Sequence, residues 1–240
     1  MISFILPAHD EERSIAAAVA SVHAAAQAVG VPYEVIVVDD ASIDRTAARA
    51  RESGARVMTV DHRQIARTRN AGAWVAKGDS LCFVDADTLV TGALLADALR
   101  ALERGAIGGG ALVRFDGRLP PYAFPVLRLL DGVMLFGRLA AGCFLFCTRE
   151  AFERAGGFDE SLFAGEELAI SRALHRQGRF VMLRRRVVTS GRKLRSHSLV
   201  EVMSFLGRLV RGGVATLRTR EGLEVWYGPR REDPKDAKAA

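Results

Sequence analysis

Two aspartates one residue apart follow a short apolar run in the segment Phe83-Val84-Asp85-Ala86-Asp87. The carboxylates of Asp85 and Asp87 are hard oxygen donors of the kind that Mg²⁺ or Mn²⁺ prefers, and such an ion commonly completes its shell with phosphate oxygens. The pattern therefore indicates a metal site for a phosphorylated ligand, with Asp87 and Asp85 as the ligands. The alternative is structural: Asp85 ends a strand and Asp87 begins a turn.

A second pair of carboxylates, Asp39 and Asp40, follows the apolar residues 36–38. Carboxylates at the end of a buried strand can accept hydrogen bonds from the N–H of a nucleotide base or from ribose hydroxyls. A ligand without these donors leaves the acceptors unpaired, which makes the contact selective. Asp39 and Asp40 are therefore candidate nucleotide contacts. The alternative is a solvated Asp39 followed by helix capping through Asp44.

Two arginines are candidates for phosphate binding. Arg69 lies close to Gly72, where the lack of a side chain permits close packing, and its guanidinium could hold a phosphate or stack on a base. Arg192 lies in the basic segment 189–195, which contains Gly191 and could fold over a diphosphate to neutralise a leaving group. The alternative for each is a solvated residue without a ligand, at a helix start for Arg69 and in a loop for Arg192.

The elements that must position these residues alternate between apolar strands and Ala-rich helices. This order predicts an α/β fold with a mostly parallel sheet and helices on both faces. Open sheets of this kind bind ligands at the carboxyl ends of their strands, which is where the four aspartates lie. The expected strands of the first half are residues 2–6, 34–38, 56–60 and 80–84, and the expected helices are residues 14–29, 44–53, 64–76 and 91–105.

The second half of the chain alternates less regularly. A basic stretch, residues 184–195, follows the last expected strand. The expected strands are residues 107–115, 142–147 and 180–183, and helices are expected within residues 120–139, 166–177 and 199–210. Residues 150–155 precede an expected turn at residues 156–160.

The composition is that of a folded protein with a positive charge. The 240 residues are 49% hydrophobic, and 34 Lys and Arg against 28 Asp and Glu give a net charge of +6, which suits an anionic partner. The three cysteines lie in apolar runs and are expected to be reduced core thiols. No basic leader precedes an apolar segment, and the longest apolar stretch, residues 127–146, contains three charged residues. We therefore expect a cytoplasmic protein without a membrane span.

Taken in order, these segments resemble the inverting glycosyltransferases of family 2, whose nucleotide-binding core has the GT-A fold. The opening Pro7-Ala8-His9-Asp10-Glu11 is similar to the family's P-x-x-N-E turn, with His9-Asp10 where Tyr-Asn is more usual. Residues 37–46 are similar to its VVDDxSxDxT segment, and residues 69–79 to its RNxG followed by AxGD. The resemblance places Asp85 and Asp87 at the metal and diphosphate, and Asp40 at the base. It implies nucleotide contacts by Pro7, Ala8, Asp39, Asp40, Arg69 and Asp85.

The resemblance continues in the second half of the chain. Residues 156–160 are similar to the family's GGFDE region, and Glu166-Glu167 stands where the family carries Glu-Asp, the Asp being its general base. Glu167 is thus the implied base and Glu166 the second candidate. Because a glutamate reaches one methylene further than an aspartate, the acceptor hydroxyl must sit further back. The structural alternative is that both are acidic residues of the kind favoured at a helix N-terminus.

The implied activity is inverting transfer of a sugar from a nucleoside diphosphate sugar to a hydroxyl acceptor, assisted by Mg²⁺ or Mn²⁺. The implied architecture is a single GT-A-like domain followed by a charged tail. The expected parts are a nucleotide-binding half (1–105), an acceptor-side half (106–195), a C-terminal helical segment (196–228) and a flexible tail (229–240).

Three other functions are weighed against this one. A non-catalytic module that only binds a sugar nucleotide is favoured by Glu166-Glu167 in place of Glu-Asp. A sugar nucleotidyltransferase needs a glycine-rich phosphate turn after the first strand, and residues 7–10 contain no glycine. Nucleic-acid binding is not expected, because aromatic residues make up only 7% of the chain and no recognition motif accompanies the arginines.

The segment Leu199–Val210 has apolar residues at helical spacing beside Arg208. Such a helix could dock on an anionic bilayer, where it would meet a lipid-linked acceptor. The alternative is that it packs on the protein's own core or on the partner in a homodimer.

Overall fold

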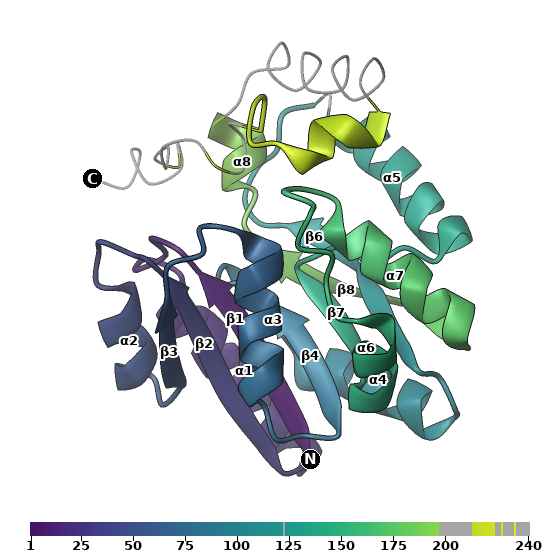
Figure 1. Cartoon of the computed structure of the whole chain (residues 1–240), viewed down its shortest axis with the longest axis horizontal. Coiled ribbons are helices and arrows are strands. Elements are labelled where there is room, and N and C mark those ends of the chain that lie inside the picture. The colour runs from purple at the N-terminus through teal and green to yellow at the C-terminus, as the bar shows by residue number, and fades with distance from the viewer. Residues whose placement is uncertain (122, 197–212, 224–226, 228–232, 234–240) are drawn as a thin grey trace.

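The computed structural model describes residues 1–121, 123–196, 213–223, 227 and 233, which form one α/β domain (Figure 1). Its eight-stranded sheet has the order β3-β2-β1-β4-β7-β6-β8-β5. The strands are β1 (Ile2–Ala8), β2 (Tyr33–Asp40), β3 (Arg56–Val60), β4 (Ser80–Val84), β5 (Thr88–Leu89), β6 (Gly108–Phe115), β7 (Phe144–Thr148) and β8 (Phe180–Thr189). The helices are α1 (Ile15–Val29), α2 (Thr46–Glu52), α3 (Ile65–Val75), α4 (Gly92–Glu103), α5 (Ala123–Gly137), α6 (Arg149–Ala155), α7 (Glu166–Gln177), α8 (Arg192–Ser196) and the 3₁₀ helix η1 (Gly213–Arg218).

The sheet is mostly parallel, as predicted. The pairs β1–β2, β1–β4, β2–β3 and β6–β8 are parallel, whereas β7 runs antiparallel to both β4 and β6. Two reversals of direction make β6 and β8 point the same way as β4. The carboxyl ends of β1, β2, β4, β6 and β8 therefore lie along one edge of the sheet, and α8 lies at the same edge (Figure 1).

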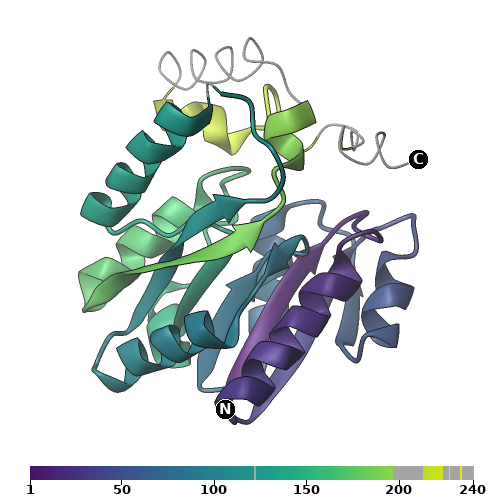
Figure 2. The ribbon, with the colours of Figure 1, turned by 180° about the vertical axis from the view of Figure 1, so that it is seen from behind.

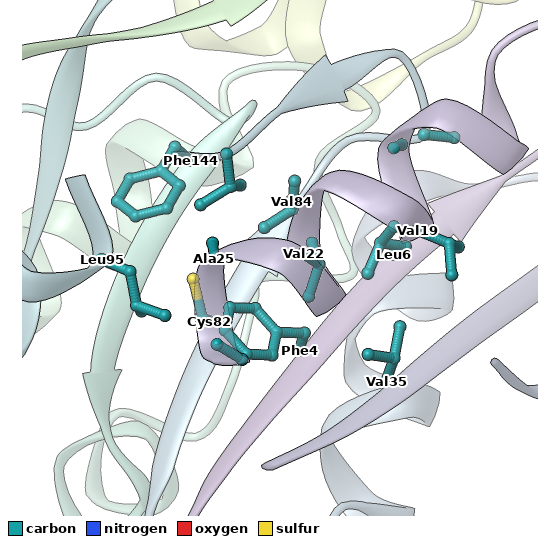
Figure 3. Packing of buried hydrophobic residues seen from close by; sticks show 14 of the residues in the cluster. Phe4, Leu6, Val19, Val22, Ala25, Val35, Cys82, Val84, Leu95 and Phe144 are labelled. Carbon is teal, nitrogen blue, oxygen red and sulfur yellow. The ribbon is translucent and has the colours of Figure 1, made fainter. Parts of the chain in front are cut away.

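Helices cover both faces of the sheet and divide the core into two apolar layers. The helices α1 and α4 cover one face, and α3, α6 and α7 cover the other (Figures 1 and 2). Figure 3 shows the first layer, where Phe4 and Leu6 of β1 pack against Val19 and Val22 of α1. Every residue of β1 is buried, as expected for a central strand that is covered on both faces.

Local signals in the sequence set several of these boundaries. Gly30 ends α1 in the left-handed conformation with φ of 72°, and the Thr91 hydroxyl caps α4 by accepting a hydrogen bond from the Leu94 backbone N–H. Helix α7 has the predicted bounds. The three cysteines are buried and free, as predicted.

The last strand was predicted too short. Strand β8 continues to Thr189, six residues past the predicted end at Leu183, and pairs with the two-residue strand β5, which was not predicted. A bulge opposite Ala111 lets the strand continue through its arginines. These side chains are exposed, and Arg185 forms an ion pair with Asp97 on α4. A strand whose charges point to solvent lacks the apolar run on which the prediction relied.

Two predictions concern the C-terminal part of the chain. The expected helix over residues 199–210 lies outside the described residues. Of the expected tail, residues 229–240, the structure describes Asp233, whose buried carboxylate forms an ion pair with Arg195 at 2.5 Å. In the described part of the chain, no helix combines the length and the hydropathy that crossing a bilayer requires.

Helix α3 approaches the sheet most closely at Gly72. A Cβ atom at this position would lie 2.5 Å from Cγ2 of Ile5 on β1 and 2.8 Å from Cγ2 of Val38 on β2. Both neighbours are buried, β-branched side chains that cannot move aside easily. The glycine therefore sets the distance between the sheet and α3, which carries Arg69.

Substitution of Gly72 tests this close approach. We expect Gly72→Ala to lower the free energy of unfolding by about 1–3 kcal/mol, because overpacking outweighs the better helix propensity of alanine. Gly132→Ala on α5 is the matched control, since no heavy atom lies within 4 Å of its added Cβ, and it should leave stability unchanged or raise it. Thermal unfolding of both variants measures the difference, and equal stability of the two would contradict the assignment.

Candidate active site

The predicted site residues gather at the carboxyl edge of the sheet. Asp85 and Asp87 follow β4, Glu166 and Glu167 begin α7, and Arg192 begins α8. These residues are far apart in the sequence, but Arg69 joins Asp85 to Glu166 at this edge, and Arg192 pairs with Glu11 of the turn after β1.

Arg69 of α3 connects the two halves of the site. Its guanidinium is buried, with 1% of the residue exposed, and Nη1 donates a hydrogen bond of 2.6 Å to Oε1 of Glu166. Nη2 donates to Oδ1 of Asp85 at 2.9 Å and to the Gly142 carbonyl oxygen at 3.0 Å. The ring of Phe158 lies 5.3 Å from the guanidinium carbon. One buried cation therefore holds a carboxylate of the β4 end and a carboxylate of the α7 start together.

These contacts give Arg69 a positioning role. The Nη atoms are occupied by protein acceptors, and Nε is buried without a partner among the described residues. A direct nucleotide contact by Arg69 thus stays a prediction. Gly142 is part of the arrangement, because a Cβ there would lie 2.7 Å from Nη2 and would force the guanidinium away.

The two adjacent glutamates have different environments. Glu166 is 3% exposed, and its carboxylate is committed to Arg69. Glu167 has no ion pair in the described part of the chain. Burial and, to a smaller extent, the neighbouring charge of Glu166 together raise the pKa of the Glu167 carboxyl to about 8, although Arg69 partly offsets them. A carboxylate with a raised pKa and no bound cation is suited to accept a proton near neutral pH.

Asp87 lies in a concentration of negative charge. Burial, and then the carboxylates of Glu11 and Asp85, together raise its pKa to about 6 against the opposing charges of Lys193 and Arg192. The Thr189 hydroxyl, at the end of β8, donates to Oδ1 of Asp87 at 3.2 Å. Clustered carboxylates that disfavour each other's ionisation are a favourable place for a cation.

This donor set fits Mg²⁺ or Mn²⁺ shared with a ligand. Asp87 and Asp85 offer hard oxygen donors, and the mutual repulsion of the carboxylates would be relieved by a divalent cation. The described residues contain no group of three His, Cys, Asp or Glu side chains that could hold a metal ion.

An ion pair between Arg192 and Glu11, which was not predicted from the sequence, lies next to Asp87. Nη2 of Arg192 lies 2.7 Å from Oε1 of Glu11, which is 5% exposed. The Ser14 hydroxyl donates to the other oxygen of Glu11 at 2.7 Å. This pair joins the turn after β1 to the start of α8 and holds Arg192 close to Asp87. The signal for Glu11 was its place in the P-x-x-N-E turn, but its partner is 181 residues away.

Asp39 and Asp40 differ in their hydrogen bonding. Oδ1 of Asp40 accepts from the backbone N–H groups of His62 and Arg63, and Oδ2 accepts from the Gln64 N–H and the Thr68 hydroxyl. These four bonds use the capacity of a carboxylate and cap the start of α3. By contrast, Oδ1 of Asp39 is buried without a partner in the described part of the chain. The acceptor left for a ligand therefore belongs to Asp39, and base contact by Asp40 stays a prediction.

Pro7 and Ala8 end β1 and are buried beside β2. In the register of the two strands, Pro7 is opposite Val38 and Ala8 is opposite Asp39. The turn that they begin is thus adjacent to Asp39. Their contact with a nucleotide stays a prediction.

Comparison with known proteins agrees with this geometry. The sequence profile of Glycosyl transferase family 2 matches residues 3–127, which is more than half of the chain. The chain belongs to glycosyl transferase family 2. The match covers β1 to β6 and includes both aspartate pairs and Arg69. The protein is therefore a glycosyltransferase that takes its sugar from a nucleotide sugar, and not a nucleotidyltransferase.

Solved structures of glycosyltransferases share the fold at low sequence identity. Mannosyltransferase PcManGT from Pyrobaculum calidifontis, solved with GDP-Man and Mn²⁺, has a TM-score of 0.65 and 18% identity over 99% of this chain and 67% of its own. TarS 1-349 from S. aureus, solved with UDP-GlcNAc, has a TM-score of 0.62 and 20% identity over 87% and 66%. Glucosyl-3-phosphoglycerate synthase from Mycobacterium tuberculosis, solved with Mn²⁺, UDP and phosphoglyceric acid, has a TM-score of 0.63 and 18% identity over 97% and 80%. A search of curated protein sequences finds no match.

The GT-A-like architecture of this family 2 glycosyltransferase is thereby confirmed. The matches extend across nearly the whole chain, so they include the second half, which holds α7 and its glutamates. Substitution of Asp40 and of Asp39 tests whether the hydrogen bonds of Asp40 stabilise the fold and those of Asp39 do not.

We expect Asp40→Asn to destabilise this glycosyltransferase and Asp39→Asn to leave its stability unchanged. An asparagine at position 40 replaces one acceptor oxygen by an NH2 group, which would face donors of the chain, and this should cost about 2 kcal/mol, or roughly 4–8 °C in Tm for a chain of this size. Differential scanning calorimetry of both variants measures the effect. A larger loss for Asp39→Asn than for Asp40→Asn would show that the capping role is assigned to the wrong residue.

Proposed function

We propose that this glycosyltransferase moves the sugar with inversion to a hydroxyl acceptor that Glu167 deprotonates. In this reaction the acceptor oxygen attacks the anomeric carbon from the face opposite to the departing diphosphate, so the base and the leaving-group residues must face one small site from two sides. The observation that carries the proposal is the joint contact of Arg69 with Asp85 and Glu166. Through this contact Asp85, a proposed metal ligand, lies near the start of α7, which carries Glu167.

We assign the base to Glu167 because the two adjacent glutamates differ in their ion pairing. Glu166 is buried, and its Oε1 atom lies 2.6 Å from Nη1 of Arg69, so its carboxylate is engaged in this ion pair. Glu167 follows it on the same helix turn, and burial raises its pKa to about 8. A base with this pKa removes a hydroxyl proton as the new bond forms more readily than an ordinary carboxylate does.

The donor would be held by residues of the first half and of α8. The unpaired Asp39 oxygen suits the ring N–H of either uracil or guanine, because both present a donor. Arg192 would donate to the diphosphate and neutralise the leaving group. Bound at Asp87 and Asp85, Mg²⁺ or Mn²⁺ would supply a Lewis acid for the charge on the leaving diphosphate. The Mn²⁺ in the PcManGT and glucosyl-3-phosphoglycerate synthase structures supports this choice of metal.

Removal of the proton acceptor tests the base. We expect Glu167→Gln to lower the turnover of donor hydrolysis by about 10²–10⁴-fold and to leave donor affinity unchanged. In the wild type, kcat/KM should rise with pH and level off above about pH 8, because only deprotonated Glu167 accepts a proton. The measurement is release of nucleoside diphosphate from a panel of UDP- and GDP-sugars with Mn²⁺, with water as the acceptor.

Glu166→Gln is the matched control. It removes the neighbouring charge that raises the pKa of Glu167, so the rise of kcat/KM should move to lower pH instead of disappearing. If Glu166→Gln abolishes the rise and Glu167→Gln keeps it, Glu166 is the base. The first sugar anomer released from an α-linked donor should be β in an NMR time course, and an α anomer would refute inversion.

Removal of Asp87 tests the metal and diphosphate site. We expect Asp87→Asn to abolish the Mn²⁺-dependent rise in Tm that a nucleoside diphosphate produces, because the asparagine cannot provide the charge that a divalent cation requires. Asp97→Asn is the control, since Asp97 pairs with Arg185 on the outside of α4 and β8. A Mn²⁺-dependent shift of wild-type size in Asp87→Asn would exclude Asp87 as the ligand.

A further inference from the structure

The outer face of α5 exposes an apolar surface that the catalytic site does not use. Phe136 is 93% exposed and Leu129 is 70% exposed, and Ala123 is the one fully buried residue of the helix. Among the described residues, six of the ten exposed large hydrophobic side chains belong to this helix. These six are Phe124, Val126, Leu129, Leu130, Val133 and Phe136.

Five of these side chains form one stripe. Residues 126, 129, 130, 133 and 136 recur at helical spacing, so they project on the same side of α5. The other side of the helix faces β6. Figures 1 and 2 both show α5 at the periphery of the molecule. A concentrated apolar surface of this kind marks an interaction site more often than scattered exposed residues do.

The segment of the chain that contains α5 carries more positive than negative side chains. The four exposed arginines between residues 114 and 138 form no ion pair in the described part of the chain. The two aspartates of the same segment are already ion-paired, Asp131 with Arg186 and Asp116 with Arg195, which also pairs with Asp233. The unpaired arginines are Arg114, Arg118, Arg128 and Arg138.

We propose that α5 docks this glycosyltransferase on the surface of an anionic bilayer. The apolar stripe would enter the boundary between headgroups and acyl chains, and the arginines would bind lipid phosphates. A second copy of the chain fits less well, because a two-fold interface uses the same patch on both sides, and both aspartates of this segment already have arginine partners. The partner is therefore anionic lipid.

Docking has a consequence for the acceptor, and this consequence rests on the proposed function. The chain leads from the end of α5 to Ala140, whose N–H binds the Ser171 hydroxyl of α7, and to Gly142, whose carbonyl binds Arg69. The segment that follows the docked helix is thus part of the wall of the site beside the base. A bilayer at α5 brings lipid close to the acceptor side, so the acceptor class that fits is a hydroxyl group on a lipid-linked molecule.

Vesicle binding by the full-length chain tests the docking. We expect flotation with vesicles of phosphatidylcholine containing about 30% phosphatidylglycerol, and much weaker binding to pure phosphatidylcholine. The double substitution Leu129→Glu with Phe136→Glu should weaken binding to the anionic vesicles by at least about tenfold, because it places charge in the stripe. Ile43→Glu is the control, since Ile43 is equally exposed at 93% but lies outside α5, and it should bind as the wild type does.

Other partners of the apolar stripe on α5 predict different outcomes of these measurements. Equal binding of the double variant and the wild type would overturn the proposal. A wild-type dimer that the double variant converts to a monomer in light scattering without vesicles would assign the face to a second copy. A loss of several degrees in Tm for the double variant, about what one lost core contact costs, would show that the chain itself covers the stripe. Donor hydrolysis in solution should stay at the wild-type rate, so failure of docking is distinguishable from failure of the proposed chemistry.

Discussion

The buried guanidinium of Arg69 is the constraint on which the site depends. A cation with 1% exposure is tolerated only where nearby carboxylates compensate for its lost hydration, and Asp85 and Glu166 provide that compensation. Each carboxylate in turn depends on Arg69, because either would be left as an unpaired charge without it. The three side chains come from α3, the end of β4 and the start of α7, so the requirement for neutrality fixes three elements relative to one another.

The ion pair with Arg69 also gives the neighbouring residues Glu166 and Glu167 different environments. Burial holds the pKa of Glu167 well above the usual range, and the nearby charge of Glu166, which pairs with Arg69, acts in the same direction. Adjacent residues of the same type therefore have different surroundings: Glu166 is the ion-pair partner of Arg69, and Glu167 is the residue that we propose as the base. The longer side chain in place of the usual aspartate does not prevent this, because the environment and not the residue type sets the pKa.

The sequence predicted the elements whose residues show a local pattern. The strands from β1 to β4 are apolar runs that end in polar residues, and α7 has a clear start and stop, so their positions were predicted closely. The prediction ended strand β8 too early. Its arginines have partners such as Asp97 on a helix that is distant in the sequence, and a local pattern does not reveal such contacts. The same limit applies to the site. The aspartates were found, but the roles of Glu11 and Asp40 depend on contacts with residues far along the chain.

The charge balance of the site explains why donor and metal belong together. Two of the nearby cations are already engaged, Arg69 by Asp85 and Glu166, and Arg192 by Glu11. Asp87 adds a further negative charge at the place where a diphosphate would lie, and its own pKa is raised because the local carboxylates outweigh Lys193 and Arg192. A diphosphate entering alone would therefore be repelled. As proposed above, Mg²⁺ or Mn²⁺ at Asp87 and Asp85 would reverse the local potential, which would favour donor binding and would allow Arg192 to exchange Glu11 for phosphate oxygens.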